Sequence, residues 1–191
     1  KKKIIFVTWL NINLDITDSE LINMYLVVMN KPQELFIELE KHEKNHGHDY
    51  FYEIRNLDRT DEFSTKTDVE LAARTIYLNK ACFNRLYRVN SKNEFIVPFG
   101  KKTKVNTYDG GNLITVSNYL TMNDIMILNC DFEEAVKDAK KGDFIYFDPP
   151  YDSDTNTFNS YTEDGFSKNE QRRLFEVYKE LKERYGIKDT D

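Results

Sequence analysis

Apolar side chains recur at helical spacing through the first half of the chain. Between residues 19 and 30 they occupy one face of a predicted helix. Pro32, a residue typical of the first helical turn, opens a second helix that Gly47 ends. Residues 49–56 predict a short aromatic helix. The apolar positions of the first helix are Leu21, Ile22, Tyr25, Val28 and Met29.

A fourth helix is expected after the polar loop 57–66. Thr67 and Glu70 have the spacing of a capping box, in which each side chain satisfies the backbone amide of the other residue. The expected buried side of the helix that follows continues as far as residue 79. The helix delivers residues 83–88 into a loop.

Short apolar runs predict strands elsewhere. Residues 125–128 and 144–147 are apolar and rich in β-branched or aromatic side chains, residues 1–9 become so after three lysines, and residues 94–99 alternate between apolar and polar positions. These four segments are the candidate strands, and the runs at 125–128 and 144–147 predict buried ones.

Two further helices are expected among these strands. One covers residues 132–139, and the other follows a second capping box at Ser167 and Glu170. Gly110-Gly111 predicts a flexible turn. Strands that alternate with helices are typical of a parallel sheet, so the sequence predicts the α/β class.

The composition is that of a soluble globular protein. Of the 191 residues, 40% are hydrophobic and 31% are charged, which suits one compact domain or somewhat more. No apolar run is long enough to span a membrane. Cys82 and Cys130 lie in different predicted elements, and two unpaired thiols are typical of a reducing cytoplasm, the expected location.

The charge is unevenly distributed. A net charge of −6 argues weakly against a nucleic-acid partner, but residues 74–104 hold eight basic residues and a single acid, Glu94. A basic segment on an acidic body suits a phosphate-facing patch, and the alternative is an ordinary solvated face. The basic residues are Arg74, Lys80, Arg85, Arg88, Lys92, Lys101, Lys102 and Lys104.

Three histidines lie close together in the sequence. His42 and His46 have the i, i+4 spacing of a metal-binding helix face, and His48 follows. No nearby cysteine or third-ligand frame accompanies them, and the segment is rich in lysine and glutamate. We therefore expect a solvated helix end and no metal site.

Asp148-Pro149-Pro150-Tyr151 directly follows the strand predicted at residues 144–147. Proline supplies no amide to a sheet ladder, so Asp148 falls at the carboxyl end of the strand, where open α/β sheets bind ligands. A carboxylate and a main-chain carbonyl can accept the hydrogens of an exocyclic base amine and free its lone pair. The Tyr151 ring offers a stacking face to an extruded base. The alternative is an ordinary surface turn.

This motif after such a strand resembles the catalytic motif of amino-methyltransferases that use S-adenosylmethionine. A second block, residues 78–90 followed by Phe95-Ile96-Val97-Pro98-Phe99-Gly100, resembles the target-recognition region of Dam-type adenine-N6 DNA methyltransferases, the D12 class. The resemblance runs from about Asp15 to near the end of the chain.

The resemblance implies a cofactor site and a catalytic site. The implied catalytic residues are Asp148, Pro149, Pro150 and Tyr151. The implied residues for S-adenosylmethionine are Asp15, Asp131, Phe132 and Asp148. Asp15 would bind the ribose, for which Asp18 is the alternative, and Asp131-Phe132 would hold the adenine. As a further alternative, Asp131 caps the helix predicted at 132–139.

The resemblance also implies a surface for double-stranded DNA. Arg88 would read a base edge, and Phe83 and Asn84 would contact the DNA around a flipped nucleotide. The implied DNA-binding residues are Phe83, Asn84, Leu86, Arg88, Pro98, Lys101 and Lys102. The alternative is a hairpin that only covers the core.

The fold that the resemblance implies is a partial Rossmann-like methyltransferase sheet with a helical target-recognition insertion. Residues 1–30 and 119–191 would form an incomplete catalytic domain, and residues 31–118 the recognition domain. The implied activity is methyl transfer to the N6 amine of a flipped adenine in duplex DNA. GATC is the common target of the family, and a cognate restriction endonuclease acting on the same site is a candidate partner.

Three features depart from the family pattern. No glycine precedes Gly47, so the expected Gly-rich cofactor turn is missing; Arg85 stands where the family usually has glycine; and the last strands of the family do not follow Ile187. The alternative function is therefore a catalytically inactive, truncated fragment with residual DNA binding. Unpaired sheet edges would make such a fragment poorly soluble or prone to associate.

Overall fold

The computed structural model describes residues 4–8, 17–123, 125–128, 130–149 and 168–185. The chain divides into two compact units. The first unit comprises Lys1–Asp15 and Leu128–Asp191, and the second comprises Ile16–Ile127.

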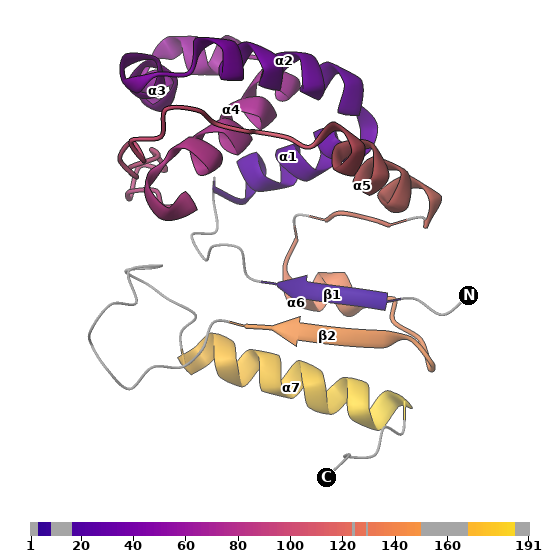
Figure 1. Cartoon of the computed structure of the whole chain (residues 1–191). Helices are drawn as coiled ribbons and strands as arrows, with labels where there is room; N and C mark the ends of the chain where they lie inside the picture. The colour runs from indigo at the N-terminus through magenta and orange to yellow at the C-terminus, as the bar shows by residue number, and fades with distance from the viewer. Residues whose placement is uncertain (1–3, 9–16, 124, 129, 150–167, 186–191) are drawn as a thin grey trace. The chain divides into compact units, whose positions relative to one another are not determined.

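The second unit is helical (Figure 1). Its five α-helices are α1 (Thr17–Asn30), α2 (Pro32–Asn45), α3 (His48–Asn56), α4 (Asp68–Ala81) and α5 (Gly110–Met122). Short 3₁₀ turns follow α3, as η1 (Leu57–Arg59) and η2 (Asp61–Thr65), and α4, as η3 (Phe83–Arg85). The first four α-helices lie where the sequence predicts them.

Helix α4 lies at the centre of this unit and packs against α1, α2 and α3. It begins at the predicted capping box, because the Thr67 side chain accepts from the Glu70 amide while the Glu70 carboxylate accepts from the Thr67 amide. Both of its long faces are buried. One joins a cluster with α1 and α2 that includes Leu35 and Leu39, and the other a cluster with α3 that includes Phe51.

A buried ionic network ties five segments of this unit together: α1, α3, η1, α4 and the segment around Phe95. Arg74, only 2% exposed, donates to the carboxylates of Asp58 (2.6 Å) and Glu20 (3.2 Å) and to the carbonyls of α3 residues Ile54 and Arg55. Asp58 also accepts from the Phe95 amide at 2.7 Å. Burial raises the pKa of the Glu20 carboxyl, although Arg74 opposes this shift. Arg74 is therefore a structural cation and not part of a phosphate-facing patch.

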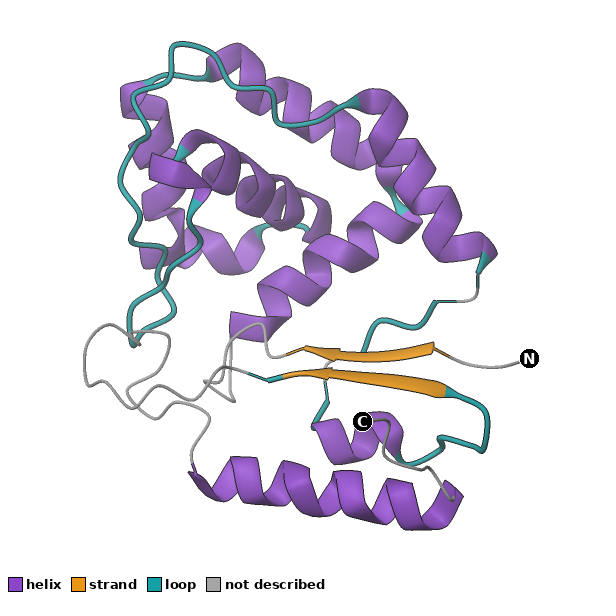
Figure 2. Cartoon of the chain, turned by 60° about the horizontal axis from the view of Figure 1, so that its bottom comes forward, coloured by secondary structure: helices purple, strands orange, loops and turns teal. Residues whose placement is uncertain are grey.

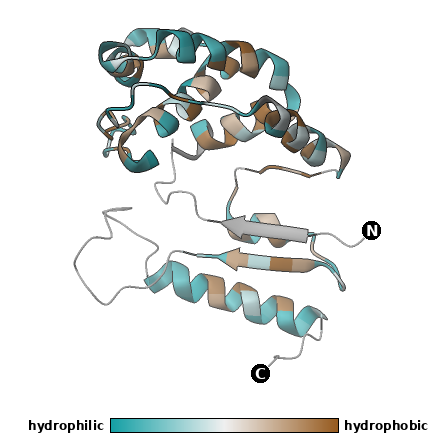
Figure 3. Cartoon of the chain, in the orientation of Figure 1, coloured by the Kyte–Doolittle hydropathy of each residue, from teal (hydrophilic) through white to brown (hydrophobic). Residues whose placement is uncertain are grey.

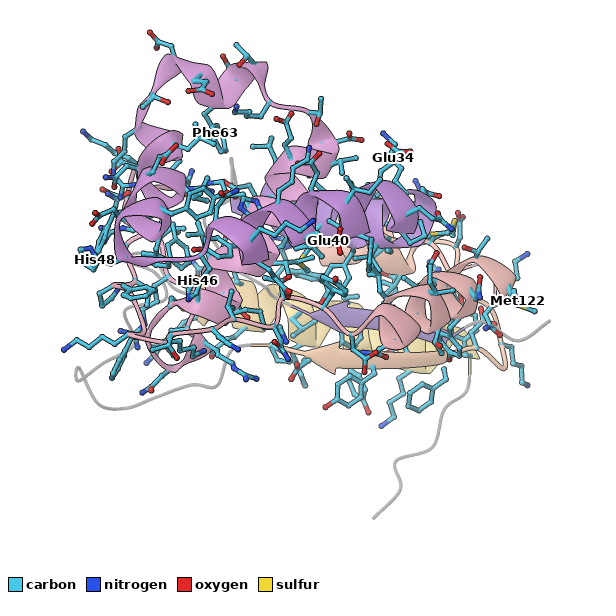
Figure 4. All side chains as sticks on the ribbon, turned by 45° about the horizontal axis from the view of Figure 1, so that its top comes forward. Glu34, Glu40, His46, His48, Phe63 and Met122 are labelled. Carbon is cyan, nitrogen blue, oxygen red and sulfur yellow. The ribbon has the colours of Figure 1, made fainter. Side chains whose placement is uncertain are left out.

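The histidines are part of the helical packing. His42 is buried and stacks on Tyr77 with ring centroids 4.8 Å apart, and its Nδ1 lies 2.8 Å from the Tyr50 hydroxyl. His46 bonds the Tyr77 hydroxyl (3.0 Å) and the Lys102 carbonyl (3.1 Å), while His48 is exposed (Figure 4). The expectation of a solvated helix end holds only for His48. In the described part of the chain, no cluster of three or more His, Cys, Asp or Glu residues could hold a metal.

Residues 94–99 do not form the predicted strand. The chain makes two isolated antiparallel bridges, Val89 with Phe95 and Cys82 with Phe99, in place of a ladder. Pro98 has no amide to donate, which interrupts a continuous ladder. The predicted alternation is nevertheless present, since Phe95 and Val97 are buried while Ile96 and Pro98 are exposed.

Gly110-Gly111 is the first turn of a helix, not the predicted flexible turn. The Asp109 carboxylate accepts from the amides of Gly111 (3.1 Å) and Asn112 (3.4 Å) and so caps α5. This capping offsets the low helix propensity of the glycines. The last residue of α5, Met122, is 81% exposed (Figure 4).

The first unit contains a parallel strand pair. Strand β1 (Ile4–Thr8) pairs with β2 (Phe144–Asp148), with Ile4 opposite Phe144 and Thr8 opposite Asp148. Helices α6 (Phe132–Val136) and α7 (Lys168–Tyr185) pack on one face of this pair (Figure 2). A strand is thus confirmed at residues 4–8 of the predicted segment 1–9 and at the predicted residues 144–147, and the two strands are neighbours.

Strand β2 is buried on one face only, whereas the sequence predicts a buried strand. Ile145 and Phe147 pack against the cluster formed by α6 and α7, but Phe144 is 60% and Tyr146 45% exposed. Along β2, successive residues therefore alternate between a covered face and an open face. Figure 3 shows the hydropathy of this strand.

Two predictions near α6 are wrong. Residues 125–128 are not a strand, and Met126 and Leu128 are exposed, because no neighbouring segment among the described residues offers them a ladder. Helix α6 ends at Val136, three residues before the predicted end. Lys137 already makes a shorter-range amide bond, to the Glu134 carbonyl.

Two observations bear on the wider setting. None of the helices in the described residues is both long and apolar enough to cross a membrane. Cys82 and Cys130 are free thiols in different units, the first buried and the second exposed.

We predict that Asp58→Asn lowers the free energy of unfolding by about 3 kcal/mol, because it leaves the buried Arg74 guanidinium short of a counter-charge. Urea denaturation followed by circular dichroism measures this. The matched control is Glu62→Gln, which removes a carboxylate from an exposed ion pair with Lys66 and should cost under about 1 kcal/mol. Equal losses for the two variants would contradict the network.

We also predict a pH-dependent stability that depends on His42. Burial lowers the pKa of His42 from 6.5 to about 4, so the unfolded chain takes up this proton first as the pH falls. The contribution of neutral His42 to the free energy of unfolding is therefore fully present above pH 6.5. It falls by on the order of 2 to 3 kcal/mol as the pH approaches 4. His42→Phe keeps a ring on Tyr77 and should reduce this fall, whereas replacement of the exposed His48 by Gln should not.

Candidate functional site

The Asp-Pro pair of the predicted catalytic motif lies at the carboxyl end of β2. Asp148 is the last residue of the strand and is paired with Thr8 of β1, and Pro149 follows directly. Both residues are partly exposed. Pro150, Tyr151 and the predicted ribose-binding Asp15 lie outside the described residues, as does the alternative Asp18 side chain.

The local sequence accounts for this position of Asp148. Gly142, with φ of 97°, turns the chain into β2, and the Asp143 carboxylate accepts from the Lys140 amide at 2.9 Å to close that turn. The apolar run then pairs with β1 until proline ends the ladder. A carboxylate at this end of a parallel strand pair stands where open α/β sheets bind ligands.

A second carboxylate, Asp131, lies at the start of α6. Its Oδ1 accepts from the Glu133 amide at 2.9 Å, so Asp131 caps the helix, as the alternative from the sequence had it. Its Oδ2 accepts from Arg173 of α7, which also binds Glu133 (2.6 Å) and Glu170 (2.7 Å). The cap and the ion pair together fix the direction of this carboxylate.

Phe132 is held by the same arginine. Its ring is buried in the cluster between α6 and α7, and the Arg173 guanidinium lies 4.2 Å above the ring centroid. The sequence shows no signal for Arg173, because the contact joins residues about forty positions apart. Arg173 is thus a functional-site neighbour that sequence reasoning missed.

The carboxylates of this unit fit a nucleoside-containing cofactor by their chemistry. The Asp131 side chain is exposed and Asp148 is partly exposed, and each carboxylate oxygen can accept more than one hydrogen bond. Such acceptors suit the hydroxyl and amino groups of a nucleoside.

The predicted DNA-binding residues of the second unit lie on a loop and hairpin that follow α4. Two close contacts fix the base of the hairpin. The Phe83 amide donates to the Pro98 carbonyl (2.9 Å) and the Gly100 amide to the Ala81 carbonyl (2.9 Å). A Cβ on Gly100 would lie 2.5 Å from the Cys82 carbonyl oxygen, so only glycine allows this approach.

The far end of the hairpin is a tight turn at residues 90–94. The Asn90 side chain accepts from the amides of Lys92 and Glu94, both at 3.0 Å, and donates to the Glu94 carboxylate at 2.7 Å. The Phe95 carbonyl accepts from Arg55 (3.1 Å) and Arg59 (2.9 Å). Arg55 and Arg59 therefore attach the hairpin to the helices at Phe95, between its base and its turn.

The structure brings the predicted contact residues together on this hairpin but exposes them unequally. Phe83 is 52% exposed, and Asn84, Arg88 and Pro98 are exposed as well. Leu86 is only partly buried and packs against the core cluster around Tyr77.

Seven of the eight cations of the basic segment divide into two groups, and the eighth, Lys80, is partly exposed in the last turn of α4. Arg74 is buried in the ionic network, and the Lys102 ammonium donates to the Lys80 carbonyl at 2.5 Å, at the carboxyl end of α4. Five other cations have no side-chain partner among the residues that the structure describes, and all are exposed: Arg85, Arg88, Lys92, Lys101 and Lys104. The hairpin and the segment after it thus present cations that the fold does not use.

Comparison with known proteins identifies the family. The family model for "D12 class N6 adenine-specific DNA methyltransferase" matches residues 14–189, which is nearly the whole chain. The match includes the Asp148-Pro149 strand end and the hairpin in one span.

Individual relatives agree. The chain is 43% identical over 166 residues to the type II methyltransferase M1.LlaDCHI of Lactococcus lactis, covering 86% of this chain and 58% of that protein. It is 34% identical over 179 residues to the type II methyltransferase M.MjaIII of Methanocaldococcus jannaschii, covering 87% and 60%. A DNA adenine methylase of Haemophilus influenzae is 34% identical over 143 residues, covering 73% and 47%.

The chain thus spans about three-fifths of the length of the first two relatives and about half of the third. The family match covers far more than half of the chain and agrees with two separate blocks of the sequence. The chain belongs to the D12 class of N6 adenine-specific DNA methyltransferases.

Proposed function

We propose that this protein transfers a methyl group from S-adenosylmethionine to the N6 amine of adenine in duplex DNA. The observation that carries the proposal is the Asp148-Pro149 pair at the carboxyl end of a parallel strand, in a chain of this family.

The proposed fold is a Rossmann-like methyltransferase sheet, of which β1 and β2 are two strands. Residues 1–30 and 119–191 are proposed to form the catalytic domain, and residues 31–118 the recognition domain. The helices on one face of β2 and the parallel direction of the pair support this architecture.

S-adenosylmethionine, when bound, supplies an activated methyl group. Asp15 is proposed to bind its ribose, and Asp131 and Phe132 its adenine, with Asp148 beside the reacting end. The Asp131 carboxylate is suited to this role because its cap and its Arg173 contact hold it in one orientation. A preoriented acceptor loses little entropy on binding.

The residues of the chain act on the adenine amine. The adenine amine donates one hydrogen bond to the Asp148 carboxylate and one to the Pro149 carbonyl. These two bonds localise the nitrogen lone pair, which the ring otherwise delocalises. Asp148 is suited to accept a hydrogen because its carboxylate is partly exposed at a strand end. Pro149 and Pro150 fix the backbone, and Tyr151 is proposed to stack on the flipped base.

The hairpin of the second unit is the proposed DNA surface. Phe83, Asn84, Leu86 and Pro98 would lie against the bases, and Arg88 would read a base edge through its guanidinium fork. Lys101 would bind phosphate. The exposed cations without internal partners support this assignment. Lys102, which the sequence also suggests, already has an internal acceptor.

A partner follows from the same proposal. Two of the relatives are named type II methyltransferases. A restriction endonuclease that cuts the same unmethylated site is the corresponding partner for this chain.

We predict that Asp148→Ala and Asp148→Asn each reduce methyl transfer to duplex DNA at least 100-fold, because the adenine amine loses its anionic acceptor. The measurement is incorporation of labelled methyl groups, with N6-methyladenine identified by mass spectrometry. The matched control is Asp138→Asn, which neutralises an exposed carboxylate on the same unit and should retain activity.

Two outcomes would count against the proposal. Full activity of the Asp148 variants would remove this residue from catalysis. Sequence-independent DNA binding by the wild-type chain with no methyl transfer would favour the alternative of a DNA-binding protein without catalysis.

Substitutions of Lys101 and Lys102 should have different effects, the first on DNA affinity and the second on the stability of the fold. Lys101→Gln should weaken DNA binding uniformly across sequences and lower the salt slope of log K by about 1, with unfolding unchanged. Lys102→Met should instead lower the urea midpoint, because the carboxyl end of α4 loses its cationic cap. Fluorescence anisotropy at several salt concentrations and urea titration measure the two effects. A reversal of the two results would contradict the division of the cations.

A further inference from the structure

Two consecutive residues of the loop after α4 adopt left-handed backbone conformations. Asn84 has φ of 53° and Arg85 has φ of 55°. Asparagine tolerates this region because its short side chain can bond locally, whereas an arginine Cβ crowds the following carbonyl oxygen. Glycine would adopt the conformation at residue 85 without this penalty.

The surrounding framework imposes the conformation on residue 85. The Asn79 side chain of α4 donates to the Arg85 carbonyl at 2.8 Å, and the Leu86 amide donates to the Phe83 carbonyl at 3.3 Å. The Cys82 thiol, fully buried, lies 3.1 Å from the Leu86 carbonyl. All these contacts involve the backbone of residues 83–86, so they hold whichever side chain residue 85 carries.

The Arg85 side chain makes no compensating contact within the described residues. It is exposed, and its guanidinium has no carboxylate or carbonyl acceptor there. The neighbouring Phe83 ring is also exposed, and Arg88, three residues on, is a second exposed cation without a partner. No contact of this side chain within the described residues offsets the unfavourable backbone conformation, which points to a contact with a ligand.

We propose that Arg85 is a direct DNA contact that adds affinity to the hairpin surface. Its planar fork donates two parallel hydrogen bonds, which match the paired acceptors of a phosphate or the O6 and N7 edge of guanine. The fixed turn holds its Cα beside Phe83, so the arginine is presented from a rigid base. This inference rests on the proposed DNA methyltransferase function.

The test is Arg85→Gly in the full 191-residue chain, with Arg85→Gln beside it. Arg85→Gly should leave the urea midpoint unchanged or raise it, because it relieves the left-handed strain, and should weaken duplex DNA binding about tenfold. Arg85→Gln keeps the strain and should weaken binding to a similar degree. Lys44→Gln removes an equal charge from an exposed side chain of α2 and should change DNA affinity less than twofold.

Binding is measured by fluorescence anisotropy on duplexes of several sequences and at several salt concentrations. A uniform loss, with a smaller salt slope, assigns the acceptor as phosphate. A loss confined to duplexes with guanine at one position assigns it as a base edge. Both results support the contact.

Three results would overturn the inference. Unchanged DNA affinity in both Arg85 variants would show that the arginine does not touch DNA. A marked fall in the urea midpoint of Arg85→Gly would show that the side chain has a structural role. Failure of the wild-type chain to bind any duplex would instead reject the proposed function, and the inference with it.

Discussion

The carboxylate of Asp58 is the contact on which the helical unit depends. It binds the buried Arg74 guanidinium of α4 and the Phe95 amide of the hairpin at once. Through Arg74 it is connected to Glu20 on α1 and to the last carbonyls of α3. A buried charge pair is stabilising only when its remaining hydrogen-bonding groups are satisfied, and here the acceptors come from three helices. The position of the hairpin is therefore coupled to the core of the helices.

The cations near the hairpin fall into two groups, those bonded inside the helical unit and those exposed on its surface. Arg55, Arg59, Arg74 and Lys102 bind carboxylates or carbonyls inside the unit and give the hairpin a fixed base. The cations beyond that base remain exposed and have no internal acceptors among the described residues. A rigid base reduces the entropy that a DNA-binding loop loses on association. In the proposed function, one set of cations holds the hairpin in place and another set is available to bind DNA.

Much of the fold could be predicted from the sequence. The capping box at Thr67, the proline at the start of α2 and the apolar run before Asp148 each act through neighbours in the sequence, and each prediction is confirmed. The errors arise where a distant or competing contact decides. Gly110-Gly111 suggested a turn, but the Asp109 cap makes it a helix start. Residues 125–128 suggested a strand, but an apolar run becomes a strand only when another segment pairs with it.

The candidate site shows the same limit. The motif at Asp148 and the hairpin block could be found from residue order, because their chemistry lies in contiguous residues. The Arg173 contact with Asp131 and Phe132 and the Asp58 contact with Arg74 could not, because they join distant positions. Charge counting placed Arg74 on the surface, since the sequence does not distinguish a buried arginine from an exposed one. The left-handed conformation of Arg85 had one sequence signal, the glycine that the family usually has at this position, but the contacts of Asn79 and the hairpin backbone that impose it could not be predicted.

The central claim is that the carboxylates at the strand end and at the start of α6 belong to a cofactor site. Titration calorimetry of S-adenosylmethionine into the purified chain tests it most directly. We predict saturable binding with one site and a dissociation constant in the micromolar range. No heat of binding at millimolar ligand, from a chain that is folded by circular dichroism, would contradict the claim.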